Sequence, residues 1–456
     1  MMDRFDALVV GAGVSGLTVA RLLAQAGLRV AVLEARDRVG GRVRTEREGG
    51  RITDIGASWI HGIDDSPLFE TATALGMPVH EFTMGSYQAG GRPVAYYGPE
   101  GVRLADTDAE RFIADIAEAD AQLSRTIAEA EPGSSYADAA ALAVGAVAER
   151  GGWEASRAER VVEYLHHRSE EQYGVDASLL DAHGLDDDAV EGDEVVFPEG
   201  YDRLATSLAD GLDVRLEHPV SRVRWSDAGV EVETSRGSLA AARAVVTVPV
   251  GVMQAGSLAF EPPLPDPVAG ALAGLRMNAF EKIFLRFPER FWDEGVYAIR
   301  RQGAAGAWWH SWYDLTELHG EPTLLTFAAG ECAKQIRDWS DERIAASVMD
   351  GLRGIYGDGI PGPSHARITR WQDDEWSRGA YAYMTVGSAP EDHDRIAEPI
   401  GSGPGGPVLH LAGEASWTDD PATVSAALLS GHRAAERVLG RPIALAGLTG
   451  PLPPAD

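Results

Sequence analysis

Residues 5–42, FDALVVGAGVSGLTVARLLAQAGLRVAVLEARDRVGGR, limit the fold of this chain more than any other stretch. An apolar run ends at Val10, the pattern G-x-G-x-x-G follows, and apolar residues then recur at helical spacing up to Gly27. A second apolar run ends at Glu34, 18 residues after Gly16. This order predicts a strand, a helix and a second parallel strand, which together open an α/β domain of the Rossmann type.

The three glycines of this turn indicate a dinucleotide site. Gly11 permits the tight turn, Gly13 lets the backbone approach a pyrophosphate, and Gly16 lets the helix pack closely on the strand. The first turn of the helix offers unpaired N–H groups and a positive dipole end to the phosphates. Glu34 can accept hydrogen bonds from ribose hydroxyls. The glycines alone do not distinguish NAD from FAD.

Composition and charge narrow the class of protein. At 456 residues the chain is too long for one simple core, so two joined domains are expected. It has no apolar run of about 18 residues, and its N-terminus lacks a basic segment and a cleavage site, which favours a cytoplasmic protein without a membrane span. A net charge of −30 argues against nucleic acid and suits a cationic substrate, although acidic chains are also common for solubility alone.

The cysteine and histidine content argues against disulfide bonds and metal sites. The single cysteine, Cys332, excludes an intrachain disulfide and a cysteine-rich metal site. The twelve histidines show no spacing typical of metal ligands. We therefore expect no metal.

An unusual lysine lies in RMNAFEKIFLRF, residues 276–287. Only Lys282 and Lys334 are lysines among the 40 basic residues. With strand periodicity, Phe280, Lys282 and Phe284 share one face. An ammonium between two phenylalanines is costly to bury unless something uses it. The alternative is a stem that packs on the aromatic rings while the charge reaches solvent.

Two segments extend the nucleotide signature. ARDRVGGRVRT (35–45) places Gly40, Gly41 and Arg42 just after the acidic residue. The stretch 212–253 alternates like strands and ends in the apolar run AVVTVP. Both are expected on the nucleotide side.

The C-terminal region returns to the same kind of pattern. VLHLAGEASW (408–417) is a buried strand followed by a glycine and a glutamate. Residues 419–439 then begin a helix, with Asp420 as a plausible N-cap and Pro421 at the first helical position. Alanines and glycines keep this helix thin enough to lie against another backbone.

These segments resemble the flavin amine oxidase superfamily. The resemblance is closest to the polyamine oxidases and the oxidase domain of lysine-specific histone demethylases, with monoamine oxidases further away. It also rests on DIGASWIHG (54–62), FEKIFLRFPERFW (280–292) and RWQDDEWSRGAYAYM (370–384).

The resemblance implies a fold and a domain division. We expect an α/β protein with a discontinuous FAD-binding, Rossmann-like domain of the glutathione-reductase type and an α+β substrate-binding domain. Helices within 105–175 would cap the substrate side. The expected boundaries are 1–80, 200–265 and 395–445 for the FAD-binding domain, 81–199 and 266–394 for the substrate-binding domain, and 446–456 for a tail.

The resemblance also implies a set of residues around FAD. Arg42 would lie near the phosphates, Glu414 would bond the ribityl chain, and Val220 would contact the adenine through its backbone, with Val223 as a near alternative. FAD would be non-covalent, because the C-terminal motif has no cysteine. The expected cofactor residues are Gly11, Gly13, Gly16, Glu34, Ala35, Arg36, Gly41, Arg42, Gly56, Ala57, Ser58, Trp59, Val220, Trp376, Gly413, Glu414, Thr423 and Val424.

Catalytic and substrate residues follow from the same resemblance. Lys282 would sit beside flavin N5 and hold a water, where a cation stabilises charge that develops as O₂ is reduced. His61 can bond an amine or accept its proton. The expected catalytic residues are Lys282, Tyr381 and His61, and the expected substrate contacts are Trp59, His61, Glu170, Trp371, Tyr381 and Thr423.

Acidic side chains are further candidates for contacts to a distal amino group. Glu170, Glu171 and Asp181 could bind it, and the acidic run 186–194 is either a solvated loop or a rim that steers a polyamine inward. In the family that the chain resembles, amino-acid oxidases carry an arginine near this loop to bind a carboxylate. SWIHG (58–62) has none, which favours an amine without an α-carboxylate.

The function implied is an FAD-dependent amine oxidase. It would oxidise a C–N bond of a primary or secondary amine, polyamine-like or aromatic, to an imine and then an aldehyde, with O₂ reduced to H₂O₂. One alternative is an oxidase or desaturase of the same fold that tailors an indole or amino-acid-derived metabolite; another is a flavin-bearing module without turnover. The expected partners are the amine and O₂, with neither nucleic acid nor a membrane, and a homodimer is left open.

Overall fold

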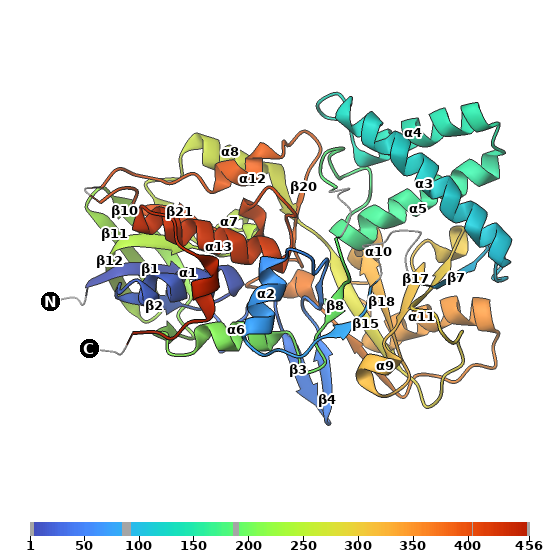
Figure 1. Ribbon diagram of the computed structural model, residues 1–456, viewed down its shortest axis with the longest axis horizontal. Coiled ribbons are helices and arrows are strands. Elements are labelled where there is room, and N and C mark those ends of the chain that lie inside the picture. Colours follow the sequence, from blue (N-terminus) through green and yellow to red (C-terminus); the bar gives the residue numbers. More distant parts are fainter. Residues whose placement is uncertain (1–3, 84–92, 186–190, 404, 454–456) are drawn as a thin grey trace.

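Two sheets of different construction organise the chain, and they lie at opposite ends of the molecule in Figure 1. The computed structural model describes residues 4–83, 93–185, 191–403 and 405–453. An eight-stranded sheet lies on the side of both termini, and a six-stranded sheet lies on the other side with a layer of helices. The predicted α/β class is confirmed.

The eight-stranded sheet is assembled from three remote parts of the sequence. Its central strand, β1 (Arg4–Val10), pairs in parallel with β2 (Val30–Leu33) and with β12 (Gly237–Val246). The order is β13-β10-β11-β12-β1-β2-β9, and β21 also pairs with β12. The other strands are β9 (Val214–Arg215), β10 (Val220–Ser226), β11 (Gly229–Thr234), β13 (Ala259–Glu261) and β21 (Leu409–Leu411).

The six-stranded sheet contains β15 (Phe280–Arg286) as its second strand, which is buried along its whole length. Antiparallel neighbours flank it on both sides, and only the β16–β7 pair is parallel. Ile283, Leu285 and Phe287 belong to one apolar core on one face of β15, as strand periodicity predicts. The order is β19 (His365–Ile368), β15, β18 (Thr323–Ala329), β17 (Ser311–Asp314), β16 (Ala298–Arg301) and β7 (Val94–Tyr97).

The expected domain boundaries agree with this division of strands, although the domains themselves stay a prediction. Every strand of the eight-stranded sheet falls within 1–80, 200–265 or 395–445, and every strand of the six-stranded sheet falls within 81–199 or 266–394. Short strands complete the set: β3 (Thr45–Glu48), β4 (Arg51–Asp54), β5 (Trp59–Ile60), β6 (His80–Glu81), β8 (Val195–Val196), β14 (Leu275–Met277) and β20 (Ala382–Met384).

Three helices form the layer above the six-stranded sheet, within the predicted range 105–175 (Figure 1). They are α3 (Asp106–Ala128), α4 (Tyr136–Gly151) and α5 (Ala155–Tyr173). Ser135 and Asp138 form a reciprocal capping box at the start of α4. Gly152 and Gly174 end α4 and α5 in the left-handed conformation, which glycine adopts without steric cost.

The nucleotide side depends on a close helix pair. α1 (Val14–Gln25) packs against α13 (Val424–Leu439), and a Cβ on Gly431 would meet the Ser15 carbonyl oxygen at 2.4 Å. The small residues of α13 therefore allow the close packing against another backbone that the sequence predicted. The other helices are α2 (Pro67–Ala74), α6 (Asp202–Ala209), α7 (Val250–Gln254), α8 (Asp266–Gly274), α9 (Thr316–His319), α10 (Gly330–Gln335), α11 (Asp341–Tyr356) and α12 (Glu391–Ile396).

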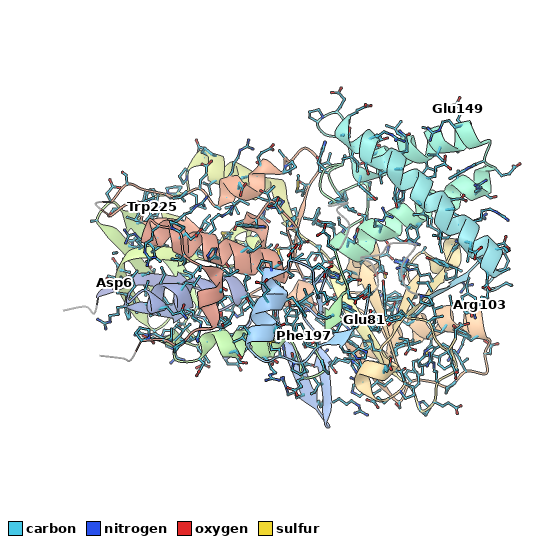
Figure 2. The ribbon with its side chains drawn as sticks, viewed as in Figure 1. Asp6, Glu81, Arg103, Glu149, Phe197 and Trp225 are labelled. Atoms are coloured by element: carbon cyan, nitrogen blue, oxygen red, sulfur yellow. The ribbon has the colours of Figure 1, made fainter. Side chains whose placement is uncertain are left out.

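Side chains fill the space between the two ends of the molecule. Figure 2 places Asp6 and Trp225 at the eight-stranded end, Glu149 and Arg103 at the other, and Glu81 between them. Across the described ranges, no helix has the combined length and apolar character that crossing a membrane requires.

Candidate active site

A cavity of about 670 Å³ connects the dinucleotide turn with the six-stranded sheet. Its wall contains Gly11, Lys282 and Glu414, which come from the start, the middle and the end of the chain. Of the residues predicted around the cofactor and the substrate, all line this cavity except Gly16 and Glu170. The fold therefore brings the sequence-predicted set together.

At the nucleotide end of the cavity, backbone groups hold the Glu34 carboxylate. The Glu34 carboxylate accepts hydrogen bonds from the Ala12 N–H at 2.7 Å and from the Arg36 N–H at 2.9 Å. Gly11 has a φ of +104°, and a Cβ on Gly16 would meet the Gly11 carbonyl oxygen at 2.0 Å. Gly16 thus lies outside the cavity wall because it provides the close helix–strand packing that the motif predicts.

Two arginines tie this end to later segments. Arg36 makes a bidentate ion pair with Asp374, with contacts of 2.8 and 2.6 Å. Arg42 Nη1 donates to Glu414 Oε1 at 2.7 Å and to the Ala380 carbonyl at 3.0 Å. Arg42 and Glu414 are 372 positions apart, so this pair joins the N-terminal motif to the C-terminal motif at the cavity wall.

The start of α13 faces the cavity, but its cap differs from the predicted one. Thr423 is the N-cap, and its side chain accepts from the Ala426 N–H at 3.0 Å. Asp420 and Ala422 have φ of +49° and +68°, so the segment around Pro421 is a turn outside the helix. The prediction of Asp420 as N-cap is wrong, because a threonine two residues after the proline caps the helix instead.

Lys282 lies in the cavity wall, buried, and its ammonium has three acceptors. It donates to the Gly56 carbonyl at 2.7 Å, to the Asp54 carbonyl at 3.3 Å and to Ser58 Oγ. Its Nζ lies 5.5 Å from the centre of the Trp59 ring. The charge is used inside the protein, so the alternative in which it reaches solvent is wrong.

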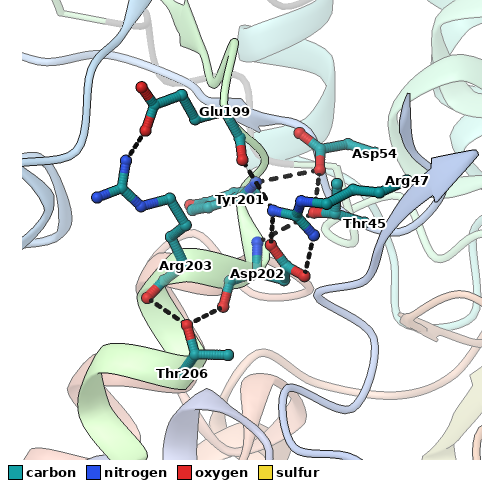
Figure 3. Close-up of polar contacts among 8 residues, drawn as sticks. All are labelled: Thr45, Arg47, Asp54, Glu199, Tyr201, Asp202, Arg203 and Thr206. Carbon is teal, nitrogen blue, oxygen red and sulfur yellow. Dashed lines mark hydrogen bonds and ion pairs between the residues drawn. The ribbon is translucent and has the colours of Figure 1, made fainter. Parts of the chain in front are cut away.

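A polar cluster holds the loop that receives Lys282 (Figure 3). Asp54 Oδ1 accepts from Thr45 Oγ1 at 2.5 Å and from the Tyr201 N–H at 3.1 Å. Burial raises the pKa of Asp54, and the nearby Lys282 opposes that rise. Burial lowers the pKa of Lys282 to about 8, and Asp54 opposes that fall. The two groups therefore stabilise each other's charged form.

Aromatic rings form the wall beyond Lys282. Trp371 Nε1 donates to the Ile55 carbonyl at 2.8 Å, which fixes one ring at the cavity edge. Phe280 stacks on Phe327 at 4.7 Å between ring centres and lies 5.7 Å from the Tyr381 ring. Burial raises the pKa of the Tyr381 phenol, so this group stays neutral. The wall can surround an alkyl or aromatic amine without a competing charge.

His61 faces the cavity and is held from behind by a carboxylate that the sequence did not single out. The His61 Nδ1–H donates to Glu194, which is fully buried. Burial lowers the pKa of His61, but the charge of Glu194 and its hydrogen bond outweigh that effect, so the net shift is upward. The contact leaves His61 Nε2 as the acceptor in this tautomer. Glu194 ends the acidic run 186–194, and because residues 186–190 lie outside the described residues, the solvated loop and the rim both stay predictions.

The three acids predicted as candidates for a distal amine contact lie in different places, and the contact itself stays a prediction. Glu171 lines the main cavity, whereas Glu170, the next residue back on α5, lines a separate cavity. Successive helical residues point about 100° apart, so only one of the two can face each space. Tyr313 donates to Glu171 Oε2 at 3.0 Å, and burial raises the pKa of Glu171 to about 7. Asp181 lies away from the main cavity wall and accepts from the Gly387 N–H at 2.8 Å.

Another acid missed by sequence reasoning organises the aromatic wall. Glu281, buried next to Lys282 in the chain, accepts from the Trp371 N–H at 2.8 Å and the Gln372 N–H at 3.0 Å. Strand alternation predicts from the sequence that Glu281 lies on the opposite face of β15 from Lys282. It does not predict which groups Glu281 binds there.

Known sequences place this arrangement in a family. The sequence profile of the flavin-containing amine oxidoreductases matches residues 14–439. Polyamine oxidase 2 of Arabidopsis thaliana is 31% identical over 458 residues, which cover 95% of this chain and 89% of that protein. The chain belongs to the flavin-containing amine oxidoreductase family.

Other relatives of this amine oxidoreductase differ in length. Lysine-specific histone demethylase 1 homolog 1 of Arabidopsis thaliana is 32% identical over 460 residues, but the chain spans only 52% of that protein. The structure of a putrescine oxidase bound to putrescine has a TM-score of 0.77 at 23% identity and covers 96% of this chain and 100% of that one. That likeness confirms the fold.

Membership confirms the predicted enzyme class and FAD as the cofactor, and the cavity fits that group. Glu414 Oε2 is buried and has no hydrogen-bond partner within the described part of the chain, so it can accept from a ribityl hydroxyl. Nothing lies within 4 Å of a Cβ built on Gly13, so the turn at the start of α1 leaves space for a phosphate. The individual cofactor contacts stay a prediction.

Proposed function

We propose that this amine oxidoreductase oxidises a C–N bond of a primary or secondary amine, polyamine-like or aromatic, with O₂ as the acceptor and H₂O₂ as a product. The observation that carries the proposal is the presence of Lys282 and the His61–Glu194 pair in the wall of the same cavity as the dinucleotide turn. The names of two relatives, a polyamine oxidase and a putrescine oxidase, support this substrate class.

FAD would be held non-covalently by the residues that line the nucleotide end. Glu34 would bond the ribose, the Gly11–Gly13 turn and Arg42 would hold the phosphates, and Glu414 would bond the ribityl chain, since all of these residues line the cavity. When bound, FAD supplies the acceptor for the hydride that leaves the substrate α-carbon, and O₂ then removes the two electrons to give H₂O₂. The oxidised product is an imine, which water hydrolyses to an aldehyde and an amine or ammonia.

His61 is proposed to take the proton that a cationic amine must lose. Only the neutral amine has the lone pair that supports loss of a hydride from the adjacent carbon. Glu194 holds the Nδ1–H, so Nε2 is the acceptor toward the cavity. Glu194 also stabilises the imidazolium that forms, in the same way that a buried carboxylate supports a catalytic histidine.

Lys282 is proposed to act in the step that consumes O₂. Its ammonium is fixed by the loop 54–58 and stabilises negative charge that develops next to it. Trp371 and Tyr381 enclose the substrate chain and exclude water, and Glu171 binds a distal ammonium. These roles divide the cavity into a reacting end and a recognition end.

A panel of amines tests the proposal. The purified protein is mixed in air with putrescine, spermidine, aromatic amines and amino acids, and peroxide is measured. We expect peroxide with amines that lack an α-carboxylate and little with amino acids. Peroxide only with indole or amino-acid-derived metabolites would favour the tailoring oxidase, and no peroxide with any compound would contradict oxidase activity.

A further inference from the structure

Two consecutive residues of β15 carry opposite charges and point to opposite sides of the six-stranded sheet. Lys282 lies in the wall of the main cavity together with Phe280. Glu281 faces the other side, where Ile283 and Leu285 belong to an apolar core, and it is only 3% exposed. A carboxylate buried on an apolar face is costly unless several donors hold it.

The donors that hold Glu281 all come from one short segment, residues 369–372. Its Oε2 accepts from Thr369 Oγ1 at 2.6 Å and from the Trp371 N–H at 2.8 Å. Its Oε1 accepts from the Gln372 N–H at 3.0 Å. Burial raises the pKa of Glu281, and these hydrogen bonds oppose that rise. The carboxylate therefore fixes the segment against β15 through both of its oxygens.

Trp371 connects this segment to the loop that receives Lys282. The Trp371 Nε1–H donates to the Ile55 carbonyl at 2.8 Å. The carbonyl groups on either side, those of Asp54 and Gly56, accept from the Lys282 ammonium at 3.3 and 2.7 Å. Of three successive carbonyl groups, the middle one thus binds the indole and the outer two bind the ammonium. A displacement of Trp371 would therefore move the acceptors of Lys282.

We propose that Glu281 is a positioning residue that holds Trp371 in place and, through Trp371, the acceptors of the Lys282 ammonium. In this arrangement β15 fixes both the lysine and the loop that receives it, the lysine directly and the loop through residues 369–372. The consequence for O₂ reduction rests on the proposed role of Lys282. The position and charge of the ammonium, however, can be measured without turnover.

Other titratable groups act on the same ammonium from the cavity side. Burial lowers the pKa of Lys282 to about 8, and Asp54 opposes that fall. The charge of Lys282 in turn opposes the upward shift of the His61 pKa. Glu281 points to the other side of β15 from this ammonium, so we expect its influence to pass through hydrogen bonds rather than directly through its charge.

The chain has only two lysines, so the ionisation of Lys282 can be measured directly. NMR of the holoenzyme labelled with ¹³C at the lysine ε-carbons follows both groups as the pH changes, and Lys334→Met assigns them. In Glu281→Gln, an NH₂ group replaces one acceptor oxygen and cannot accept from the donor that bonded there. Residues 369–372 should shift, the ammonium should lose acceptors, and the titration midpoint of Lys282 should fall by about half a pH unit or more.

Two further variants separate the proposed route from a general effect. Glu375→Gln is the matched control, because Glu375 is an exposed acid that follows Trp371 in the chain and does not line the main cavity. It should leave the midpoint of Lys282 unchanged. Trp371→Phe keeps an aromatic ring but removes the donor to Ile55, so it should also lower the midpoint. In the double variant with Glu281→Gln, the shift should be smaller than the sum of the two single shifts.

The outcomes decide between the assignment and its alternatives. A wild-type midpoint of Lys282 in Glu281→Gln, with native circular dichroism and flavin content, would overturn the assignment. An unchanged midpoint in Trp371→Phe would also overturn it, and this variant tests the same route if Glu281→Gln does not fold. Shifts that add in the double variant would show that the two residues act independently, which contradicts the route.

The same variants distinguish this assignment from the proposed function. The pH dependence of flavin reoxidation by O₂ is measured beside the NMR titration. If the midpoint of Lys282 falls in Glu281→Gln and the reoxidation profile moves with it, both are supported. If the midpoint falls but the reoxidation profile does not move, the positioning by Glu281 is supported and the proposed role of Lys282 in O₂ reduction is contradicted.

Discussion

The two halves of the main cavity are built by different means. In the nucleotide half, the buried Glu34 carboxylate is satisfied by the N–H groups of Ala12 and Arg36. In the substrate half, Lys282 and His61 are paired with groups on other segments, and His61 depends on Glu194. The partners of Glu34 lie within one strand–helix–strand unit, whereas the partners of Lys282 and His61 come from remote segments, and His61 depends on a side chain that can change charge.

The groups expected to make the activity depend on pH lie in the substrate half. Burial lowers the pKa of Lys282 to about 8 and raises the pKa of Glu171 to about 7. Both groups therefore change charge close to neutral pH, and both lie in the substrate half. Substitutions in the nucleotide half should affect the presence of the cofactor, and substitutions in the substrate half should affect rates and their pH dependence.

The largest effect is expected in the nucleotide half, from Gly16→Ala. The added Cβ would meet the Gly11 carbonyl oxygen at 2.0 Å, and neither backbone can move without breaking the turn. We expect a loss of unfolding free energy of about 3 kcal/mol and loss of bound flavin, measured by thermal melting and by flavin absorbance. Gly270→Ala is the control, because nothing lies within 4 Å of its Cβ. A flavin-replete, stable Gly16→Ala protein would contradict the account of this turn.

Lys282→Met should give the largest effect in the substrate half. Removal of the ammonium should slow flavin reoxidation by O₂ about 100-fold while the flavin stays bound. In the wild type, reoxidation should slow as the pH rises through about 8, because Lys282 loses its charge there, and the variant should lack this limb. Stopped-flow mixing with O₂ measures both, and Lys334→Met, at the other and half-exposed lysine, is the control. Equal O₂ kinetics in the two variants would remove Lys282 from this role.

Glu194→Gln should produce an intermediate effect through His61. Without the carboxylate charge, the pKa of His61 falls, so the acidic limb of the kcat/KM profile should move to lower pH. The maximal rate should drop about 10-fold, because the imidazolium loses its stabilising partner. A pH profile that does not move would show that Glu194 only supports the fold.

Glu171→Gln should change recognition more than chemistry. In the wild type, the KM for a diamine should fall as the pH rises through about 7, because Glu171 becomes ionised and pairs with the distal ammonium. The variant should lose this dependence and raise the diamine KM about 10-fold, with kcat little changed. The KM of butylamine, which has no distal amino group, should be nearly the same in the wild type and the variant. An equal rise in KM for the diamine and for butylamine would refute the contact.

The smallest effect is expected from Val220→Ala. The predicted adenine contact uses the Val220 backbone, so removing two methyl groups from a half-buried side chain should change FAD affinity by less than about twofold. Dissociation of FAD, followed by fluorescence, measures it. A larger loss would place the side chain itself against the cofactor.

The sequence allowed most of the nucleotide half to be predicted, because its information is local. The motif around Gly11 and Glu34 lies within one strand–helix–strand unit, and each of its glycines is required there for one geometric reason. Arg42 and Glu414 are remote, but each belongs to a recognisable motif.

The substrate half was predicted less completely, because its partners have no local signal. Glu194 lies in an acidic run whose pattern equally fits a solvated loop, and only tertiary structure shows that it is buried behind His61. The choice between Glu170 and Glu171 depends on the rotation of α5 about its axis, which helical spacing alone does not determine. The N-cap at Thr423 was missed because positive φ values at Asp420 and Ala422, on either side of Pro421, make a turn that leaves the proline outside the helix.

The most direct test of the central claim is the absorption spectrum of the purified protein during anaerobic titration with putrescine or spermidine. At neutral pH we expect a flavin absorption band that bleaches when the amine is added and returns when air is admitted. A colourless protein that takes up no FAD, or a bound flavin that no amine reduces, would contradict it.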